Sequence, residues 1–358
     1  MSRIVIERRE RLRLRLAPQA AVVAKSGSAL DIADIRHFPL REPVSGRRYS
    51  MLRVETRSGL VGWGECTAER TGNVDTLKRD WIGRPAYSYA TISPQMPFRA
   101  ALDMALLDIV GKAANAPVYR VLGGPTRNKV RAYGPSSGRA FPVAVIEVPE
   151  PLYRNQGKAY QNRLFELVNA VPEDHDFVLE GNGKLTPGDA SSVATTLESK
   201  HPLWFDEPCS HSNAESLRKV SAETVVPLGF GKGIDDPGVF QALLREGLID
   251  LVRPEIGVFG IYGAKRVAAL AEPYYVAVAP RHDGGPVGTA AAIQLAASLP
   301  NFFIQQVPSA SDEKDQAMRR EIVSPAVEDA KDGFLSVPKE PGLGIRVNES
   351  ALEKYGAA

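Results

Sequence analysis

The sequence predicts an α/β protein in which a (β/α) barrel follows a smaller α+β domain. Five polar residues recur at intervals of 26, 26, 23 and 26 residues, each after a short apolar run: Glu180, Asp206, Lys232, Glu255 and Arg281. An interval of that length fits one strand plus one helix. Because the C-terminal ends of barrel strands converge on one mouth, the same interval predicts where these side chains gather.

The α+β domain is predicted at residues 31–127. Residues 31–36 and 49–56 alternate between polar and apolar side chains. Ser58-Gly59 favours a turn, after which residues 60–65 are predicted to run back along the preceding strand. This pattern is typical of an antiparallel hairpin or meander. Residues 97–114 place apolar side chains at helical spacing and predict a packed amphipathic helix.

The barrel is predicted at residues 128–308, where strand-like and helix-like stretches alternate. Sequential strands joined by crossover helices form a parallel sheet, and about eight of them close a barrel. The expected strands are residues 130–133, 143–148, 177–180, 203–206, 226–230, 249–253, 276–280 and 302–305, with helices at 189–198, 237–246 and 264–271. Residues 309–358 are predicted to pack back on the N-terminal domain.

The first 30 residues differ from the rest in composition. Six arginines and two glutamates lie within residues 1–15, and a small-residue apolar stretch follows at 17–24. The segment is interpreted either as a basic tail outside the fold or as a degenerate export signal with Arg8-Arg9 as a twin-arginine pair. We expect a cytoplasmic protein, with periplasmic export as the alternative.

Bulk composition excludes several classes of partner. The chain is 44% hydrophobic and 24% charged, which is ordinary for a globular protein, and its net charge is +2. That charge is too small to predict a nucleic-acid partner. No apolar run approaches the roughly 20 residues of a membrane-spanning helix. We therefore expect neither nucleic acid nor membrane, and a small molecule instead.

Several segments resemble the enolase superfamily, in particular its mandelate racemase-like branch, which includes mandelate racemase and muconate lactonizing enzyme. They are residues 58–65 (SGLVGWGE), 100–108 (AALDMALLD), 117–124 (PVYRVLGG), 333–334 (GF) and 341–345 (PGLGI). The resemblance implies a modified TIM barrel of the (β/α)7β type. It also implies an N-terminal α+β capping domain completed by the C-terminal segment, and a homo-oligomer.

The same resemblance implies an activity. Members of this branch remove a proton next to a carboxylate, and a bound Mg²⁺ stabilises the intermediate. The implied function is that of a lyase or isomerase: a dehydratase, or a racemase or epimerase, acting on an acid sugar or hydroxy acid. Carboxylates at strand ends suit the hard cation. Glu180-Gly181-Asn182 and Asp206-Glu207-Pro208 match the first two ligand segments, so Glu180, Asn182, Asp206 and Glu207 are the implied Mg²⁺ ligands.

Other positions depart from the family pattern. Lys232 lies where the third ligating glutamate is expected, and Arg281 lies where the catalytic histidine is expected, with His282 one place later. Glu255 matches the acid that orients that histidine. We expect His282 or Lys232 to be the base, Glu255 the orienting acid and Arg281 the substrate-carboxylate clamp. Alternatively, Arg281 pairs with Glu255, and His282 faces away because a one-residue slip turns a side chain to the other face.

Two functions therefore stay open. The chain is a divergent Mg²⁺-dependent enzyme with a small carboxylate substrate, or it is a metal-free pseudoenzyme or small-acid-binding protein. In the second case Lys232 replaces the ion between Glu180 and Asp206. A metal beside Lys232 would meet like-charge repulsion. Binding of Mg²⁺ distinguishes the two hypotheses.

Overall fold

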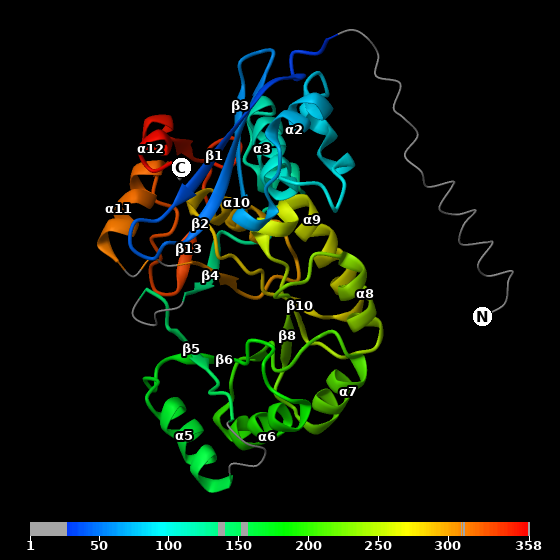
Figure 1. Cartoon of the computed structure of the whole chain (residues 1–358), viewed down its shortest axis with the longest axis vertical. Helices are drawn as coiled ribbons and strands as arrows, with labels where there is room; N and C mark the ends of the chain where they lie inside the picture. Colours follow the sequence, from blue (N-terminus) through cyan, green and yellow to red (C-terminus); the bar gives the residue numbers. More distant parts are fainter. Residues whose placement is uncertain (1–26, 135–139, 152–156, 309, 311, 357–358) are drawn as a thin grey trace, which may run out of the picture.

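The computed structural model describes residues 27–134, 140–151, 157–308, 310 and 312–356. A three-stranded sheet with its helices forms one part of the molecule, and parallel strands with outer helices form the other (Figure 1). The predicted basic tail or export signal, residues 1–30, lies outside the described residues except for residues 27–30.

The N-terminal part is built on the antiparallel sheet β1-β2-β3. β1 (Ile32–Arg41) pairs with β2 (Arg48–Thr56), and β3 (Val61–Thr67) returns along β2 after a turn at Gly59. The predicted meander is confirmed. It is followed by 3-10 turns at Ala68–Arg70 and Ala86–Thr91 and by α2 (Val74–Trp81), α3 (Arg99–Ala113) and α4 (Val118–Val121).

Helix α3 is buried on nearly every face, whereas the sequence predicted an amphipathic helix with one polar side. The reason is that α3 lies between β3 of the sheet and α9 (Ile256–Ala271) of the barrel. Two glycines of β3 allow the close approach: a Cβ on Gly64 would lie 1.8 Å from the carbonyl oxygen of Ala101, and Gly62 meets Ala105 in the same way. α3 thus joins the capping domain to the barrel.

The barrel strands follow one another in chain order. β5 to β10 form one parallel sheet, β11 pairs in parallel with β4, and a bridge between Val278 and Phe302 links the two sets. Every predicted strand overlaps an observed one. The strands are β4 (Lys129–Tyr133), β5 (Val143–Glu147), β6 (Asp176–Glu180), β7 (Phe205–Asp206), β8 (Leu228–Phe230), β9 (Leu251–Val252), β10 (Ala277–Val278) and β11 (Gln305–Gln306).

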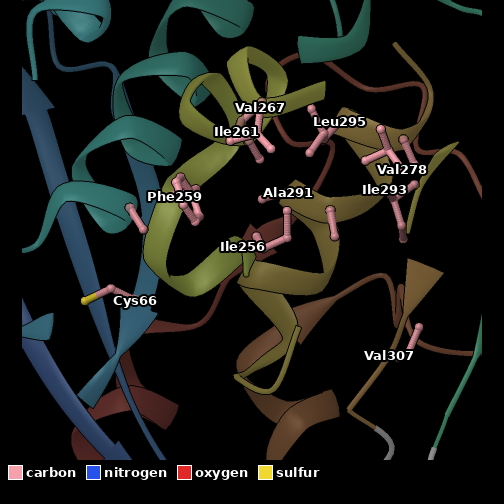
Figure 2. Packing of buried hydrophobic residues seen from close by; sticks show 14 of the residues in the cluster. Cys66, Ile256, Phe259, Ile261, Val267, Val278, Ala291, Ile293, Leu295 and Val307 are labelled. Atoms are coloured by element: carbon pink, nitrogen blue, oxygen red, sulfur yellow. The ribbon is translucent and has the colours of Figure 1, made fainter. Parts of the chain in front are cut away.

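Helices alternate with these strands, as expected for a TIM-barrel-like fold. They are α5 (Gly157–Asn169), α6 (Pro187–Leu197), α7 (Ala214–Glu223), α8 (Pro237–Arg245), α9 and α10 (Pro286–Ala296), with 3-10 turns at Glu198–Lys200 and Glu272–Tyr274. Figure 2 shows side chains of α9 and α10, among them Phe259 and Ile293, in one packed apolar cluster. Burial of such side chains is the main stabilising term.

The C-terminal segment completes the capping domain. It consists of α11 (Glu313–Ile322), β12 (Val323–Ser324), β13 (Phe334–Ser336), β14 (Arg346–Val347) and α12 (Glu349–Lys354). Asp315 accepts backbone hydrogen bonds from Val44 and Ser45, each 2.8 Å long, and Arg53 of β2 pairs with Glu349. In the middle of the segment, β13 pairs with β4 of the barrel. Across the described ranges, no helix has the length and apolarity needed to span a bilayer.

Candidate active site

Side chains at the barrel mouth follow from strand alternation. Val178, Trp204, Leu251, Ala279 and Ile304 belong to one apolar cluster inside the barrel. Because side chains on a strand alternate between faces, the residue two places further on faces the same interior, one layer closer to the strand's C-terminal end. Those residues are Glu180, Asp206, Arg253, Arg281 and Gln306. The mouth layer is therefore polar and charged.

Asp206 is the centre of this layer. It is 1% exposed, and its Oδ2 lies 3.1 Å from Nη1 of Arg281 and in contact with Nη1 of Arg253. Arg253 is 0% exposed and also donates to Tyr133 and Gln306. Burial lowers the pKa of Arg253 to about 10. Two guanidinium groups therefore neutralise one buried carboxylate.

Arg281 connects three carboxylates. Besides Asp206, its guanidinium lies 3.8 Å from Glu180 and 3.9 Å from Glu255. A parallel bridge places Glu255 and Arg281 side by side at the ends of neighbouring strands. Burial lowers the pKa of Arg281, but the charges around it, first of all those of Glu255 and Glu180, together raise it, and the net shift is upward. Both alternatives predicted for Arg281 remain compatible with this position.

Glu255 has a free oxygen. Its Oε1 is buried and has no hydrogen-bond partner among the described residues. Burial raises the pKa of Glu255, and the charge of Arg281 opposes that rise. A buried carboxyl with a raised pKa and an unused oxygen is suited to accepting a proton.

Lys232 and Asn182 meet beside this cluster, after β8 and β6, the two strands that flank β7. Lys232 is exposed, and its Nζ donates to Oδ1 of Asn182. Glu207, the other predicted ligand, points elsewhere: its Oε1 accepts the backbone N–H groups of Gly231, at 2.6 Å, and Lys232. Burial raises the pKa of Glu207 to about 7. The structure thus brings Glu180, Asp206, Glu255 and Arg281 together, with Lys232 and Asn182 paired beside them.

His282 lies apart from this cluster. It is buried between β3 and the start of α10, where its Nε2 is 2.8 Å from the carbonyl oxygen of Gly285 and 3.9 Å from Glu65. Burial lowers its pKa to about 4. It does not line the cavity at the mouth. Its placement matches the expectation of a histidine turned to the other face.

A cavity of about 350 Å³ opens above Arg281, between barrel and capping domain. Lys232, Glu255, Arg281 and Asp283 line it from the barrel, and Arg47, Arg48, Glu69 and Arg70 line it from the capping domain. At the cavity, two arginines of the capping domain form ion pairs with carboxylates of the barrel: Arg70 with Asp235 at 2.7 Å and Arg47 with Asp283 at 3.6 Å. Such a cavity between domains is a usual place for a small ligand.

The Mg²⁺ ion implied by the sequence resemblance does not fit these residues. Within the part of the chain that is described, no three or more His, Cys, Asp or Glu side chains are grouped to hold a metal. Oδ2 of Asp206 is in contact with two guanidinium groups, and the Lys232 ammonium takes the Asn182 oxygen. A cation among three positive side chains would meet strong repulsion. The fixed charges already balance the carboxylates.

Sequence reasoning missed Arg253 and Tyr133 as members of this cluster. The signal was present, because Arg253 lies two places after the interior residue Leu251 and two before Glu255. Alternation alone assigns it to the barrel interior. Tyr133 occupies the end of β4, and its hydroxyl accepts from Arg253.

Comparison with known proteins gives matches over both parts of the chain. A family model described as enolase C-terminal domain-like matches residues 153–351. Another, described as the mandelate racemase / muconate lactonizing enzyme N-terminal domain, matches residues 36–123. Together they span the capping domain and most of the barrel.

Curated relatives and a solved structure agree with these matches. A D-galactonate dehydratase family member of Streptomyces bingchenggensis is 28% identical, over 87% of this chain and 90% of that protein. A D-gluconate dehydratase of Thermoproteus tenax is 29% identical, over 91% of this chain and 74% of that protein. The structure of a mandelate racemase/muconate lactonizing enzyme from Jannaschia sp. CCS1 superposes with a TM-score of 0.78 at 23% identity, covering 92% of this chain and 98% of that one.

Proposed function

Because this chain belongs to the mandelate racemase and muconate lactonizing enzyme family of the enolase superfamily, we propose that it is a dehydratase of a hydroxy acid such as a sugar acid. The family resemblance seen in the sequence is confirmed. Both curated relatives described above are named as dehydratases or dehydratase family members. The observation that carries the proposal is the mouth cavity, in which Arg281 and Lys232 lie with the carboxyl group of Glu255.

Arg281 is proposed to bind the substrate carboxylate. Its guanidinium is anchored by Asp206, Glu180 and Glu255 and still faces the cavity. A guanidinium fork fits a carboxylate with two parallel hydrogen bonds. Because its position is fixed before the ligand arrives, little ordering is needed on binding.

Glu255 is proposed to take the proton from the carbon next to that carboxylate. Its unpartnered oxygen and raised pKa suit it to accept that proton. Arg281 and the Lys232 ammonium offset the charge that develops on the substrate. Lys232 then gives a proton to the leaving hydroxyl group, so that water departs and a double bond forms.

The test is a panel of four- to six-carbon sugar acids incubated with the full chain. Keto-acid formation reports dehydration, and exchange of the substrate proton in deuterated water reports the first step alone. Glu255→Gln is expected to lower both rates more than about 100-fold. The control Glu353→Gln, at an exposed position of α12, is expected to match the parent. Full activity in Glu255→Gln, or no exchange with any acid, would overturn the proposal.

One observation favours a second candidate, a metal-free protein that binds a small acid without converting it. Two arginines contact Oδ2 of Asp206, and Lys232 pairs with Asn182, in the region where the family places its ion. In that case acids bind, Arg281→Ala abolishes binding, and no proton exchange occurs. Self-association into a homo-oligomer and cellular location stay predictions.

A further inference from the structure

We propose that the ligand of the mouth cavity carries a second anionic group, bound by Arg48 with Arg41 beside it on the capping-domain wall. The inference rests on the proposed function, since the first anionic group is the carboxylate held by Arg281. It assigns a role to a pair of arginines that the proposed chemistry does not use.

The pairing of β1 and β2 places Arg41 directly opposite Arg48. Directly opposite residues of an antiparallel pair point to the same face, roughly 5 Å apart at Cβ, and like charges there repel. Both side chains are exposed. Neither forms an ion pair with any carboxylate among residues 27–134, 140–151, 157–308, 310 and 312–356.

The same two strands provide an internal comparison. Arg36 also lies directly opposite an arginine, Arg53. There each cation has its own partner: Arg36 lies 3.3 Å from Asp34, and Arg53 lies 2.7 Å from Glu55 and 2.8 Å from Glu349. This sheet therefore compensates one pair of facing arginines internally and leaves the other, to which the cavity residue Arg48 belongs, without a counter-charge among the described residues.

One arginine of the uncompensated pair, Arg48, lines the cavity. It comes from β2 of the capping domain, whereas Arg281 comes from the barrel. Its neighbour Arg47 is already paired, at 3.6 Å, with both Glu42 and Asp283. Five cationic side chains line the cavity against the three acidic residues Glu69, Glu255 and Asp283. When the side chains that form ion pairs are left out of this count, two cations, Arg48 and Lys232, and one acid, Glu69, remain. The cavity walls therefore favour a ligand with additional negative charge.

The ligand class follows from these positions. One end is a carboxylate at Arg281, the middle is a hydroxylated carbon chain, and the far end is a second carboxylate or a phosphate at Arg48. A dicarboxylic sugar acid and a phosphorylated sugar acid share this chemistry. Guanidinium groups bind both kinds of anion in the same bidentate way.

The experiment compares three six-carbon probes by calorimetry on the full chain: D-gluconate, galactarate and 6-phosphogluconate. At low salt we expect at least one of the two dianions to bind about tenfold more tightly than D-gluconate. The preference should shrink as ionic strength rises, because Arg48 is exposed and screening is strong there. Which dianion binds more tightly identifies the far group as carboxylate or phosphate.

Arg48→Ala is expected to remove the preference for the dianions while leaving D-gluconate affinity within about twofold of the parent. Arg48→Gln serves as a second variant of closer size. The matched control is Arg36→Ala, which removes the other facing arginine of the same strands and should keep the preference. Equal binding of all three probes by the parent, or equal weakening of all three in both Arg48 variants, would overturn the inference. Turnover of a monocarboxylate without any dianion preference would overturn this inference alone and leave the proposed function intact.

Discussion

The guanidinium of Arg281 lies 3.1 Å from the buried carboxylate of Asp206, at the centre of the barrel mouth. A fixed cation there offsets the neighbouring carboxylates and still presents donors to the cavity. It cannot exchange with solvent as an ion can. The positive charge that balances the carboxylates at this mouth is therefore carried by a side chain of the protein and not by a bound ion. This arrangement has measurable consequences.

Chelator-treated protein is expected to show no saturable Mg²⁺ binding at millimolar concentration by calorimetry. Lys232→Glu combined with Arg281→His replaces one cation by a carboxylate and weakens another, so this variant is expected to bind Mg²⁺ and melt at a higher temperature in its presence. Lys232→Gln with Arg281→His is the control that adds no carboxylate. Saturable binding by the parent would contradict the charge argument.

Arg281→Lys should weaken binding of a sugar acid about 10- to 100-fold. Lysine keeps the positive charge but loses the planar fork that holds a carboxylate by two bonds. Arg320→Lys, on the exposed face of α11, is the control and should bind as the parent does. Unchanged affinity in Arg281→Lys would show that the substrate carboxylate binds elsewhere.

Arg253→Met should lower the free energy of unfolding by about 3 kcal/mol, because it leaves part of the Asp206 charge buried without its partner. Urea denaturation measures this loss. Adding Asp206→Asn to the same variant should recover part of it, since the unpaired charge is then gone. A double variant as unstable as the sum of the two single changes would indicate that the residues are not coupled.

Stability should depend on pH through Glu65. Burial raises the pKa of this carboxyl from 4.5 to about 7, although it accepts backbone hydrogen bonds from Gly285 and Gly288. A raised folded-state pKa stabilises the fold fully below the unfolded-state value, and this contribution is lost as pH rises through about 7. Between pH 5 and 8 the parent should lose about 2 kcal/mol relative to Glu65→Gln, which cannot ionise. Parallel pH profiles would refute the assignment.

Gly64→Ala should destabilise the protein by at least about 2 kcal/mol, because the new Cβ would meet the backbone of Ala101 in α3. Gly188→Ala in α6 is the matched control: no atom lies within 4 Å of its Cβ position, so its effect should be neutral or slightly stabilising. Thermal melting of both variants tests the fit between sheet and helix. Equal melting temperatures would show that β3 can move away from α3 without cost.

Much of the fold could be predicted because strand-and-helix spacing is a local signal. The interval from Glu180 to Arg281 located the strand ends, and β6 and β7 do end at Glu180 and Asp206. The burial of α3 could not be predicted in the same way. Its far side is covered by α9, which is more than 140 residues away in sequence, and composition does not show that contact.

The site was harder to predict than the fold. A family motif predicts that a carboxylate is a metal ligand, but it does not show which side chains surround that carboxylate in the folded chain. For Asp206 the deciding neighbours are Arg253 and Arg281, which reach it from β9 and β10. His282 illustrates the same limit, because a shift of one position along the chain turns its imidazole away from the cavity and into the contact between β3 and the start of α10.

Two parts of the chain, the capping domain and the barrel, each form one wall of the cavity. Arg48 comes from the tip of the β1–β2 hairpin, and Arg281 and Glu255 come from the barrel. Exchanging Arg48 would therefore alter one wall of the cavity while Arg281 and Glu255 keep their places. The proposed ligand-selecting side chain and the proposed reacting side chains thus lie on different domains, so a protein engineer could change the first without changing the second.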